Sequence, residues 1–152
     1  MIFQNLFLAA SIASVATAAS YHCRTDGAGR REFQITVAQA DNAIAAGGTT
    51  TGGSGFPHDY YGLSGGGGRV VFQGADARCN QAQPNPSLLL EYPVFPDGRV
   101  YDKNANRRGG GTPTPARVVY LKEGSILCGV MTHVIETPDG NGSGDFRVCS
   151  YF

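Results

Sequence analysis

Residues 125–136, Ser-Ile-Leu-Cys-Gly-Val-Met-Thr-His-Val-Ile-Glu, constrain the fold more than any other part of the sequence. They form the longest apolar run of β-forming residues after the N-terminal region. Such a run predicts a strand that is buried on both faces, at the centre of a sheet. His133 stands near its end, and imidazole is suited to proton transfer near neutral pH. A structural core histidine is the simpler interpretation of His133 taken alone.

The N-terminal residues have the pattern of a secretory signal. Residues 1–20 carry no charge, and an apolar core at 6–15 is followed by Ala-Thr-Ala-Ala at 16–19, an Ala-x-Ala cleavage pattern. We therefore predict a signal peptide at residues 1–19 and a single domain at residues 20–152. The apolar core is too short for a membrane anchor, so we expect a secreted, extracellular protein with no membrane contact.

Four cysteines follow the predicted signal: Cys23, Cys79, Cys128 and Cys149. An even number of cysteines in an exported chain predicts two disulfides, and the sequence leaves all three pairings open. The chain has no Cys-x-x-Cys motif and no histidine pair one helical turn apart, so it predicts no metal site.

The charge composition argues against one class of nucleic-acid binder. Twelve Lys and Arg residues balance 12 Asp and Glu residues, and only two of the basic residues are lysines. Proteins that bind duplexes without sequence preference usually carry a basic patch that neutralises phosphates. The composition is nevertheless compatible with a small pocket that handles one phosphate.

The periodicity predicts one helix and several strands. Thr36 and Gln39 have the spacing of a capping box, and the apolar positions that follow predict a helix at 37–46, ended by Gly47 and Gly48. Strands are expected at residues 32–35, 70–72, 88–93, 116–121, 125–136 and 145–151. This order predicts an α+β fold with one α-helix packed on a twisted antiparallel sheet.

Single polar residues interrupt several of the apolar strands. Glu91 is the sole charge in 88–93, Arg117 is the sole charge in 116–121, and His133 is the sole basic residue in 125–136. Side chains alternate along strands, so each strand can place its polar residue on one shared face, with His58 nearby. Buried unpaired charges are costly, so we expect these groups to converge and pair. An inert Glu91–Arg117 ion pair is the structural alternative, and the two histidines favour a catalytic site.

The four groups suit phosphodiester transfer on RNA. Internal attack by a 2′-hydroxyl needs a base, an acid for the leaving 5′-oxygen, and a cation at the phosphoryl oxygens. A glutamate and two histidines supply the base and the acid, and an arginine supplies the cation with a bidentate fork. This chemistry requires no metal ion and no other cofactor.

These residues make the chain similar to the small secreted fungal guanyl-specific ribonucleases. The matching segments occur in the family's order: Phe56-Pro57-His58, Glu91-Tyr92-Pro93, Ala116-Arg117-Val118-Val119-Tyr120, Gly129-Val130-Met131-Thr132-His133, and Phe146 shortly before Cys149. The resemblance covers essentially the whole chain after the signal. It implies a monomeric, metal-independent endoribonuclease that cleaves single-stranded RNA to a 2′,3′-cyclic phosphate and then hydrolyses it to a 3′-phosphate.

The resemblance also implies a role for each residue. Glu91 would be the general base, assisted by His58, and His133 the general acid. Arg117 would stabilise the transition state, and Phe146 would shape the leaving-group side. The family's terminal disulfide implies the pairing of Cys23 with Cys149, which leaves Cys79 with Cys128, as in some relatives.

Two features depart from the family pattern. Phe56 stands where the family commonly has a tyrosine, and losing one hydrogen bond to phosphate is expected to cost about tenfold in rate. The base-binding loop is expected at Tyr60, Tyr61, Gly62 and Ser64, where a tyrosine can stack on a base or simply pack. Ser64 aligns with the family's guanine-reading glutamate, so guanine preference, purine preference and little preference all stay open.

Other function classes compete with an active nuclease. Phe56, Ser64 and the glycine-rich loops motivate a ribonuclease-fold effector or toxin that binds RNA or a host protein with weak or no cleavage. A ribosome-specific toxin is disfavoured, because those relatives carry long lysine-rich loops. A purely structural secreted domain is the remaining alternative, and the sequence assigns no role to His22.

Overall fold

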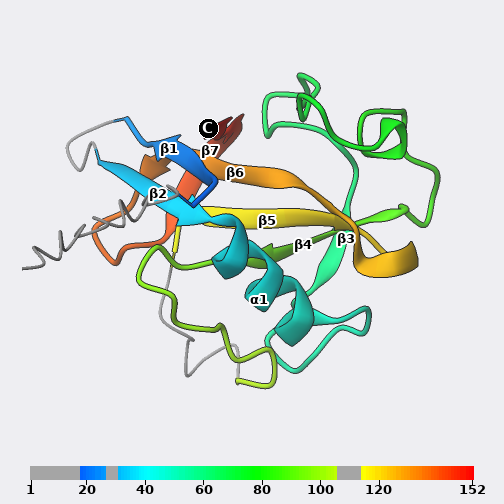
Figure 1. Ribbon diagram of the computed structural model, residues 1–152, viewed down its shortest axis with the longest axis horizontal. Helices are drawn as coiled ribbons and strands as arrows, with labels where there is room; N and C mark the ends of the chain where they lie inside the picture. The colour runs from blue at the N-terminus through cyan, green and yellow to red at the C-terminus, as the bar shows by residue number, and fades with distance from the viewer. Residues whose placement is uncertain (1–17, 27–30, 106–113) are drawn as a thin grey trace, which may run out of the picture.

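The computed structural model describes residues 18–26, 31–105 and 114–152 (Figure 1). Residues 1–17 of the predicted signal peptide lie outside the described residues. One α-helix and eight strands occur in the described parts of the chain: β1 (Ser20–Arg24), β2 (Glu32–Thr36), α1 (Val37–Gly47), β3 (His58–Tyr60), β4 (Leu89–Pro93), β5 (Ala116–Leu121), β6 (Leu127–Glu136), β7 (Gly142–Val148) and β8 (Ser150–Tyr151).

The strands form two antiparallel sheets. The larger sheet has the order β3-β4-β5-β6-β7, and the smaller one has the order β2-β1-β8. The predicted α+β fold is therefore confirmed. The apolar run at 125–136 becomes β6, an interior strand next to the middle strand β5. Residues 128–132 of β6 are buried on both faces, whereas its last four residues, from His133 on, are partly or largely exposed.

The capping box positions the helix at the end of β2. The Thr36 hydroxyl accepts a hydrogen bond from the Gln39 amide at 3.1 Å, and the Gln39 side chain accepts one from the Thr36 amide at 2.8 Å. Helix α1 ends at Gly47, one residue later than predicted, and Gly48 follows with φ 61°. These bonds satisfy two amides of the first turn, which otherwise lack intrahelical partners.

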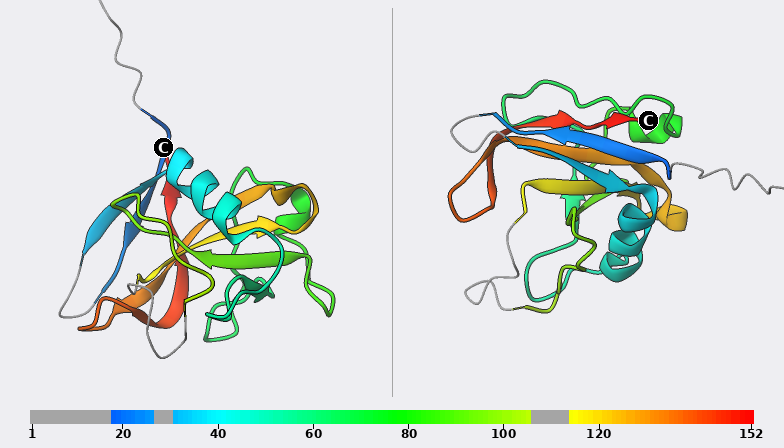
Figure 2. Two further views of the ribbon diagram at one scale, coloured as in Figure 1. Left: turned by 90° about the horizontal axis from the view of Figure 1, so that it is seen from below. Right: turned by 60° about the vertical axis from the view of Figure 1, so that its left-hand side comes forward.

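Alternation along the strands gives the larger sheet two different faces. Helix α1 lies against one face of this sheet (Figures 1 and 2), and Leu90 and Tyr92 of β4 share a core cluster with Ile44 of the helix. Leu89 of β4 points the other way and joins a second cluster, which the segment at residues 70–79 covers. Helix α1 thus covers one face of the larger sheet, and the covering segment covers one end of the opposite face.

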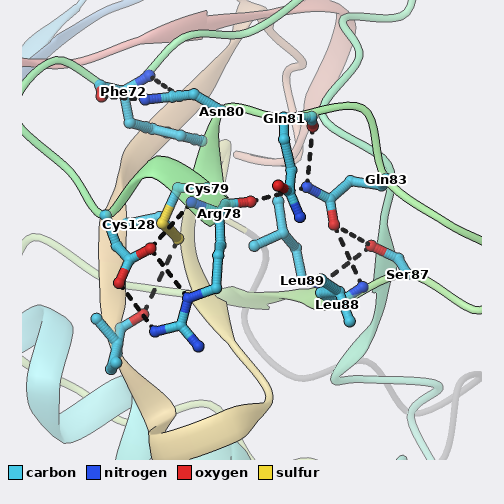
Figure 3. The surroundings of a disulfide bond; sticks show 12 residues. Phe72, Arg78, Cys79, Asn80, Gln81, Gln83, Ser87, Leu88, Leu89 and Cys128 are labelled. Atoms are coloured by element: carbon cyan, nitrogen blue, oxygen red, sulfur yellow. Dashed lines mark hydrogen bonds and ion pairs between the residues drawn. A yellow bond between two sulfur atoms is a disulfide. The ribbon is translucent and has the colours of Figure 1, made fainter.

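The covering segment differs from the sequence-based prediction. Residues 70–72 were expected to form a strand, and they form none. The main-chain N–H of Phe72 donates to Asn80 Oδ1 at 2.8 Å, and its carbonyl accepts from Asn80 Nδ2 at 2.8 Å (Figure 3). One side-chain amide therefore takes the place of a neighbouring strand, while Val70 and Phe72 are buried like core-strand residues.

The chain ends also differ from prediction. No strand was predicted before residue 32, but residues 20–24 form β1, which pairs with both β2 and β8. The last predicted strand, 145–151, starts earlier, at Gly142, and divides at Cys149 into β7 and β8. Residues 142–144, which lie between two predicted strands, therefore belong to a strand.

Two disulfides join these parts. Cys23 pairs with Cys149, and Cys79 pairs with Cys128, as the resemblance implies. The second disulfide ties the covering segment to β6 (Figure 3). In the described ranges, no helix has the length and apolar composition to cross a bilayer, and no group of three or more His, Cys, Asp or Glu side chains is placed to hold a metal ion.

Candidate active site

Neighbouring strands present the polar residues on one face. His58 on β3 lies opposite Glu91 on β4, and Glu91 lies opposite Val119, two residues after Arg117 on β5. Arg117 lies opposite Met131, two residues before His133 on β6. Residues two apart share a face, so all four side chains belong to the face opposite α1. The expected convergence of these residues is present.

His58 and Glu91 form a close pair. The distance from His58 Nε2 to Glu91 Oε1 is 2.5 Å, and His58 Nδ1 lies 3.2 Å from the carbonyl of Gly55. Both partner atoms can accept hydrogen bonds, so this geometry favours an imidazolium that donates from both ring nitrogens. The hydrogen bond to Glu91 raises the pKa of His58, against the opposing effect of burial. Glu91 Oε2 is buried without a hydrogen-bond partner among the described residues.

Arg117 is held by main-chain carbonyls. Its Nη1 donates to the carbonyl of Thr114 at 2.6 Å and to that of Ala116 at 2.9 Å. The residue is 8% exposed, and burial lowers the pKa of its guanidinium, which nevertheless remains charged. The Glu91–Arg117 ion pair that was the structural alternative is absent from the ion pairs of the described residues, where Glu91 pairs with His58. Two carbonyls already neutralise part of the charge, so Arg117 is oriented without a carboxylate.

Phe56 connects the two cationic groups. Its ring stacks on His58 with centroids 4.6 Å apart and planes at 25°, and the Arg117 guanidinium carbon lies 5.3 Å from the ring centroid. Tyr101 meets the Phe56 ring edge-on at 5.6 Å. Stacking and cation–π contacts of this kind favour one orientation of each partner. Sequence reasoning did not single out Tyr101, because it lies in a long segment with no periodic pattern.

His133 sits at the other side of Arg117. Its Nδ1 donates to the carbonyl of Gly144 at 3.0 Å, which leaves Nε2 for other partners. The Phe146 ring packs on the imidazole with centroids 4.1 Å apart. Burial lowers the pKa of His133. The two histidines of the site therefore have pKa values shifted in opposite directions.

Gly142 makes room for His133, and sequence reasoning missed it. A Cβ at Gly142 would stand 2.4 Å from His133 Cδ2 and 2.5 Å from its Cβ. No side chain fits there without moving the imidazole. The only signal of Gly142 in the sequence is a glycine between two predicted strands, which does not reveal the contact with the histidine.

The predicted base-binding residues occupy different environments. Tyr60 is 5% exposed and packs edge-on against Phe146 at 6.2 Å, so little of its ring is open to a base. Tyr61 is 44% exposed, and its hydroxyl donates to Asn85 Oδ1 at 3.3 Å. Gly62 has φ 74°, a turn conformation, and the Ser64 amide donates to the Gly68 carbonyl across a glycine loop. Tyr61 is therefore the better placed tyrosine for stacking.

The site places a carboxylate and an imidazole on opposite sides of the Arg117 guanidinium. Neighbouring strands lie about 4.8 Å apart, so the backbones of β4 and β6 are about 10 Å apart, with β5 between them. Glu91 and His133 thus stand on opposite sides of Arg117. A phosphodiester bound at the guanidinium would have a base on one side and an imidazole on the other.

Comparisons with known proteins agree with this geometry. The model of the protein family described as ribonuclease matches residues 19–150. Ribonuclease mitogillin of Aspergillus fumigatus is 33% identical over 112 residues, which cover 65% of this chain and 60% of mitogillin. The chain therefore spans less than two thirds of that relative's length.

Two solved structures have a similar fold. The crystal structure of restrictocin, described as a highly specific Aspergillus ribotoxin, has a TM-score of 0.67 at 26% identity and covers 86% of this chain and 99% of restrictocin. The solution structure of hirsutellin A from Hirsutella thompsonii has a TM-score of 0.66 at 31% identity, covering 86% of this chain and 98% of hirsutellin A. These matches confirm the resemblance to fungal ribonucleases.

Proposed function

Because the chain belongs to the ribonuclease family, we propose that it is a metal-independent endoribonuclease that cleaves single-stranded RNA by internal transesterification. The observation that carries this proposal is the placement of Glu91, Arg117 and His133 on three adjacent strands, facing one side. This order supplies base, cation and acid in the sequence that an in-line displacement at phosphorus requires.

In the first step, the 2′-hydroxyl attacks the adjacent phosphorus. Glu91 accepts the hydroxyl proton at its carboxylate, where Oε2 has no competing partner among the described residues. The bond between O2′ and phosphorus forms while the bond between phosphorus and O5′ breaks. His133 gives the proton of Nε2 to the departing O5′, since its Nδ1 is engaged with the Gly144 carbonyl. The products are a 2′,3′-cyclic phosphate and a free 5′-hydroxyl.

In the second step, water replaces the leaving nucleoside. His133, now neutral, takes a proton from the water, and Glu91 returns its proton to O2′ as the ring opens to a 3′-phosphate. Arg117 faces the phosphoryl oxygens in both steps and stabilises the charge that accumulates on them. His58 stays cationic through its bond to Glu91 and holds that carboxylate in place.

The proposed enzyme is exported from the cell. Residues 1–19 would be removed as a signal, and residues 20–152 would act as a monomer outside the cell. Two disulfides within the described chain suit an oxidising compartment.

A ribosome-specific activity is the second candidate, because restrictocin is described as a highly specific ribotoxin. Against it stands the scarcity of lysine, with two in the whole chain. Digesting intact ribosomes and deproteinised total RNA separates the two activities. General degradation of free RNA supports the first proposal, and one discrete ribosomal fragment supports the second.

The activity test uses purified residues 20–152 and single-stranded RNA. His133→Ala and Glu91→Gln should each lose most of the activity while remaining folded. His22→Ala and Glu32→Gln are matched controls that lie in the smaller sheet, away from the catalytic face. Wild-type rates in both site variants, or a folded wild-type protein that leaves RNA intact, would refute the proposal.

A further inference from the structure

Asp145 presents an unpaired carboxylate beside the candidate active site. It is an exposed residue of β7, next to Phe146. Within the described ranges, its side chain has no hydrogen bond and no ion pair, whereas most other aspartates there are bonded to a lysine, an arginine or a main-chain amide. A carboxylate without such a partner is available to a ligand.

The carboxylate lies directly against the glycine-rich loop at residues 61–68. An ideal Cβ at Gly66 would stand 2.7 Å from Asp145 Oδ2, and one at Gly65 would stand 3.0 Å from Oδ1. Glycine at both positions is what allows this close approach. The loop and the β7 carboxylate therefore form one continuous surface, although 80 residues of sequence separate them.

This surface borders the catalytic face. Tyr60, which leads into the loop, packs against Phe146, and Phe146 packs against His133. Tyr61 at the start of the loop is exposed and offers a ring for stacking. The loop follows β3, which pairs with β4 and Glu91, so it adjoins the side of the site where the proposed base meets the nucleotide with the 2′-hydroxyl. The loop itself supplies no carboxylate, because Ser64 is uncharged.

The chemistry of a free carboxylate selects among the four bases. Its two oxygens accept two parallel N–H donors. Guanine has two adjacent donors on its Watson–Crick edge, N1–H and the N2 amino group. Adenine and cytosine each place one donor beside an acceptor, and uracil places one donor between two acceptors. A carboxylate therefore pairs well with guanine alone, and proteins read unstacked RNA bases along this edge.

We propose that Asp145 is the specificity-determining residue that binds N1–H and the N2 amino group of a guanine on the 5′ side of the scissile phosphate. The carboxylate reaches the base from β7 and not from the loop that follows His58. This inference rests on the proposed ribonuclease function and adds the base that the site selects. It also explains how a chain with Ser64 in the loop can still prefer guanine.

The test compares dinucleoside phosphates that differ only in the 5′ base. With GpA and ApA as substrates, wild-type kcat/KM should favour GpA, and Asp145→Asn should lower kcat/KM for GpA by about ten- to hundredfold, the range for one charged hydrogen-bonding group. The kcat/KM for ApA should change by less than about twofold, because adenine does not pair with the carboxylate. Inosine in place of guanosine, which lacks the N2 amino group, should fall between the two. Asp41→Asn on α1 removes the same charge on the opposite face and should change neither substrate.

A second pair of variants moves the carboxylate without removing it. Gly66→Ala places a methyl group against Asp145 Oδ2, whereas Gly68→Ala meets only the Ser64 hydroxyl, at 3.3 Å. Gly66→Ala should reduce the preference for GpA over ApA, and Gly68→Ala should keep it. Equal kcat/KM for GpA and ApA in the wild type, or an unchanged preference in Asp145→Asn, would overturn the assignment of Asp145 while leaving RNA cleavage intact.

Binding separates this inference from the proposed function. Calorimetry with guanosine 3′-phosphate and adenosine 3′-phosphate, on protein carrying His133→Ala, needs no cleavage. Tighter binding of the guanine nucleotide that is lost in Asp145→Asn supports the inference even if the wild type leaves RNA uncut. Equal binding of both nucleotides contradicts it even if RNA is cut.

Discussion

Gly142→Ala is expected to displace the proposed general acid, His133, without changing that residue itself. The new Cβ would stand 2.4 Å from His133 Cδ2, and ordinary contact begins near 3.4 Å, so the imidazole and β7 must separate by about 1 Å. A misplacement of this size costs about 10²-fold in rate when the group must act in line. Overpacking of this kind destabilises a fold by about 1–3 kcal/mol, which leaves most of the protein folded.

The assay is kcat on a dinucleoside phosphate for the wild type, Gly142→Ala and His133→Ala. Ser143→Ala is the matched control, since it changes the next residue of β7, which pairs with Ile135 and not with His133. We expect kcat to fall about 10²-fold in Gly142→Ala, with near-wild-type far-ultraviolet circular dichroism and an altered imidazole NMR signal. Wild-type kcat in Gly142→Ala, with His133→Ala inactive, would show that the position of His133 is less constrained than the contact implies.

Three other predictions concern the same face and the fold behind it. NMR titration should give a pKa above about 6.5 for His58 and a pKa below about 6.5 for His133. The stability that the His58–Glu91 contact contributes is then lost as the pH rises through the folded-state pKa of His58, and the alkaline limb of kcat follows the lowered pKa of His133. The opposite order of the two midpoints would contradict both assignments. Arg117→Lys should lower kcat by about 10²- to 10³-fold, because a lysine lacks the bidentate fork. It should also lower the free energy of unfolding in urea by about 1–3 kcal/mol, because it leaves a main-chain carbonyl unpaired. An unchanged kcat would show that Arg117 takes no part in the reaction. Replacing Cys79 and Cys128 by alanine should lower the free energy of unfolding by about 4 kcal/mol, since the disulfide closes a loop of 49 residues; an unchanged melting curve would mean that the covering segment is held by its hydrogen bonds alone.

Local patterns predicted the elements that carry the catalytic residues. Apolar strands with one charge each, as in β4 around Glu91 and β5 around Arg117, are recognisable because alternation and burial leave few other ways to place that charge. The capping box at Thr36 likewise fixed the start of α1, since both of its hydrogen bonds are made within four residues. Relations confined to a few neighbouring residues are visible in a sequence.

Relations between distant residues were not visible. Phe72 looks like part of a strand, yet its backbone bonds to the side chain of Asn80. Gly142 lies between two predicted strands, yet a Cβ at this position would collide with His133 on the neighbouring strand. The partner of Glu91 is His58 and not Arg117, because the β3–β4 register decides which side chains are opposite each other. These outcomes depend on strand register and on segments far apart in the chain, which no local pattern specifies.

The central claim is that Glu91, Arg117 and His133 cleave RNA through attack by the 2′-hydroxyl. Phosphorus NMR of a dinucleoside phosphate incubated with purified residues 20–152, in the presence of a chelator, tests it most directly. The account predicts that a 2′,3′-cyclic phosphate resonance appears first and is then replaced by a 3′-phosphate, and that the 2′-deoxy analogue stays intact. Direct formation of a 5′-phosphate, or cleavage of the 2′-deoxy analogue, would contradict it.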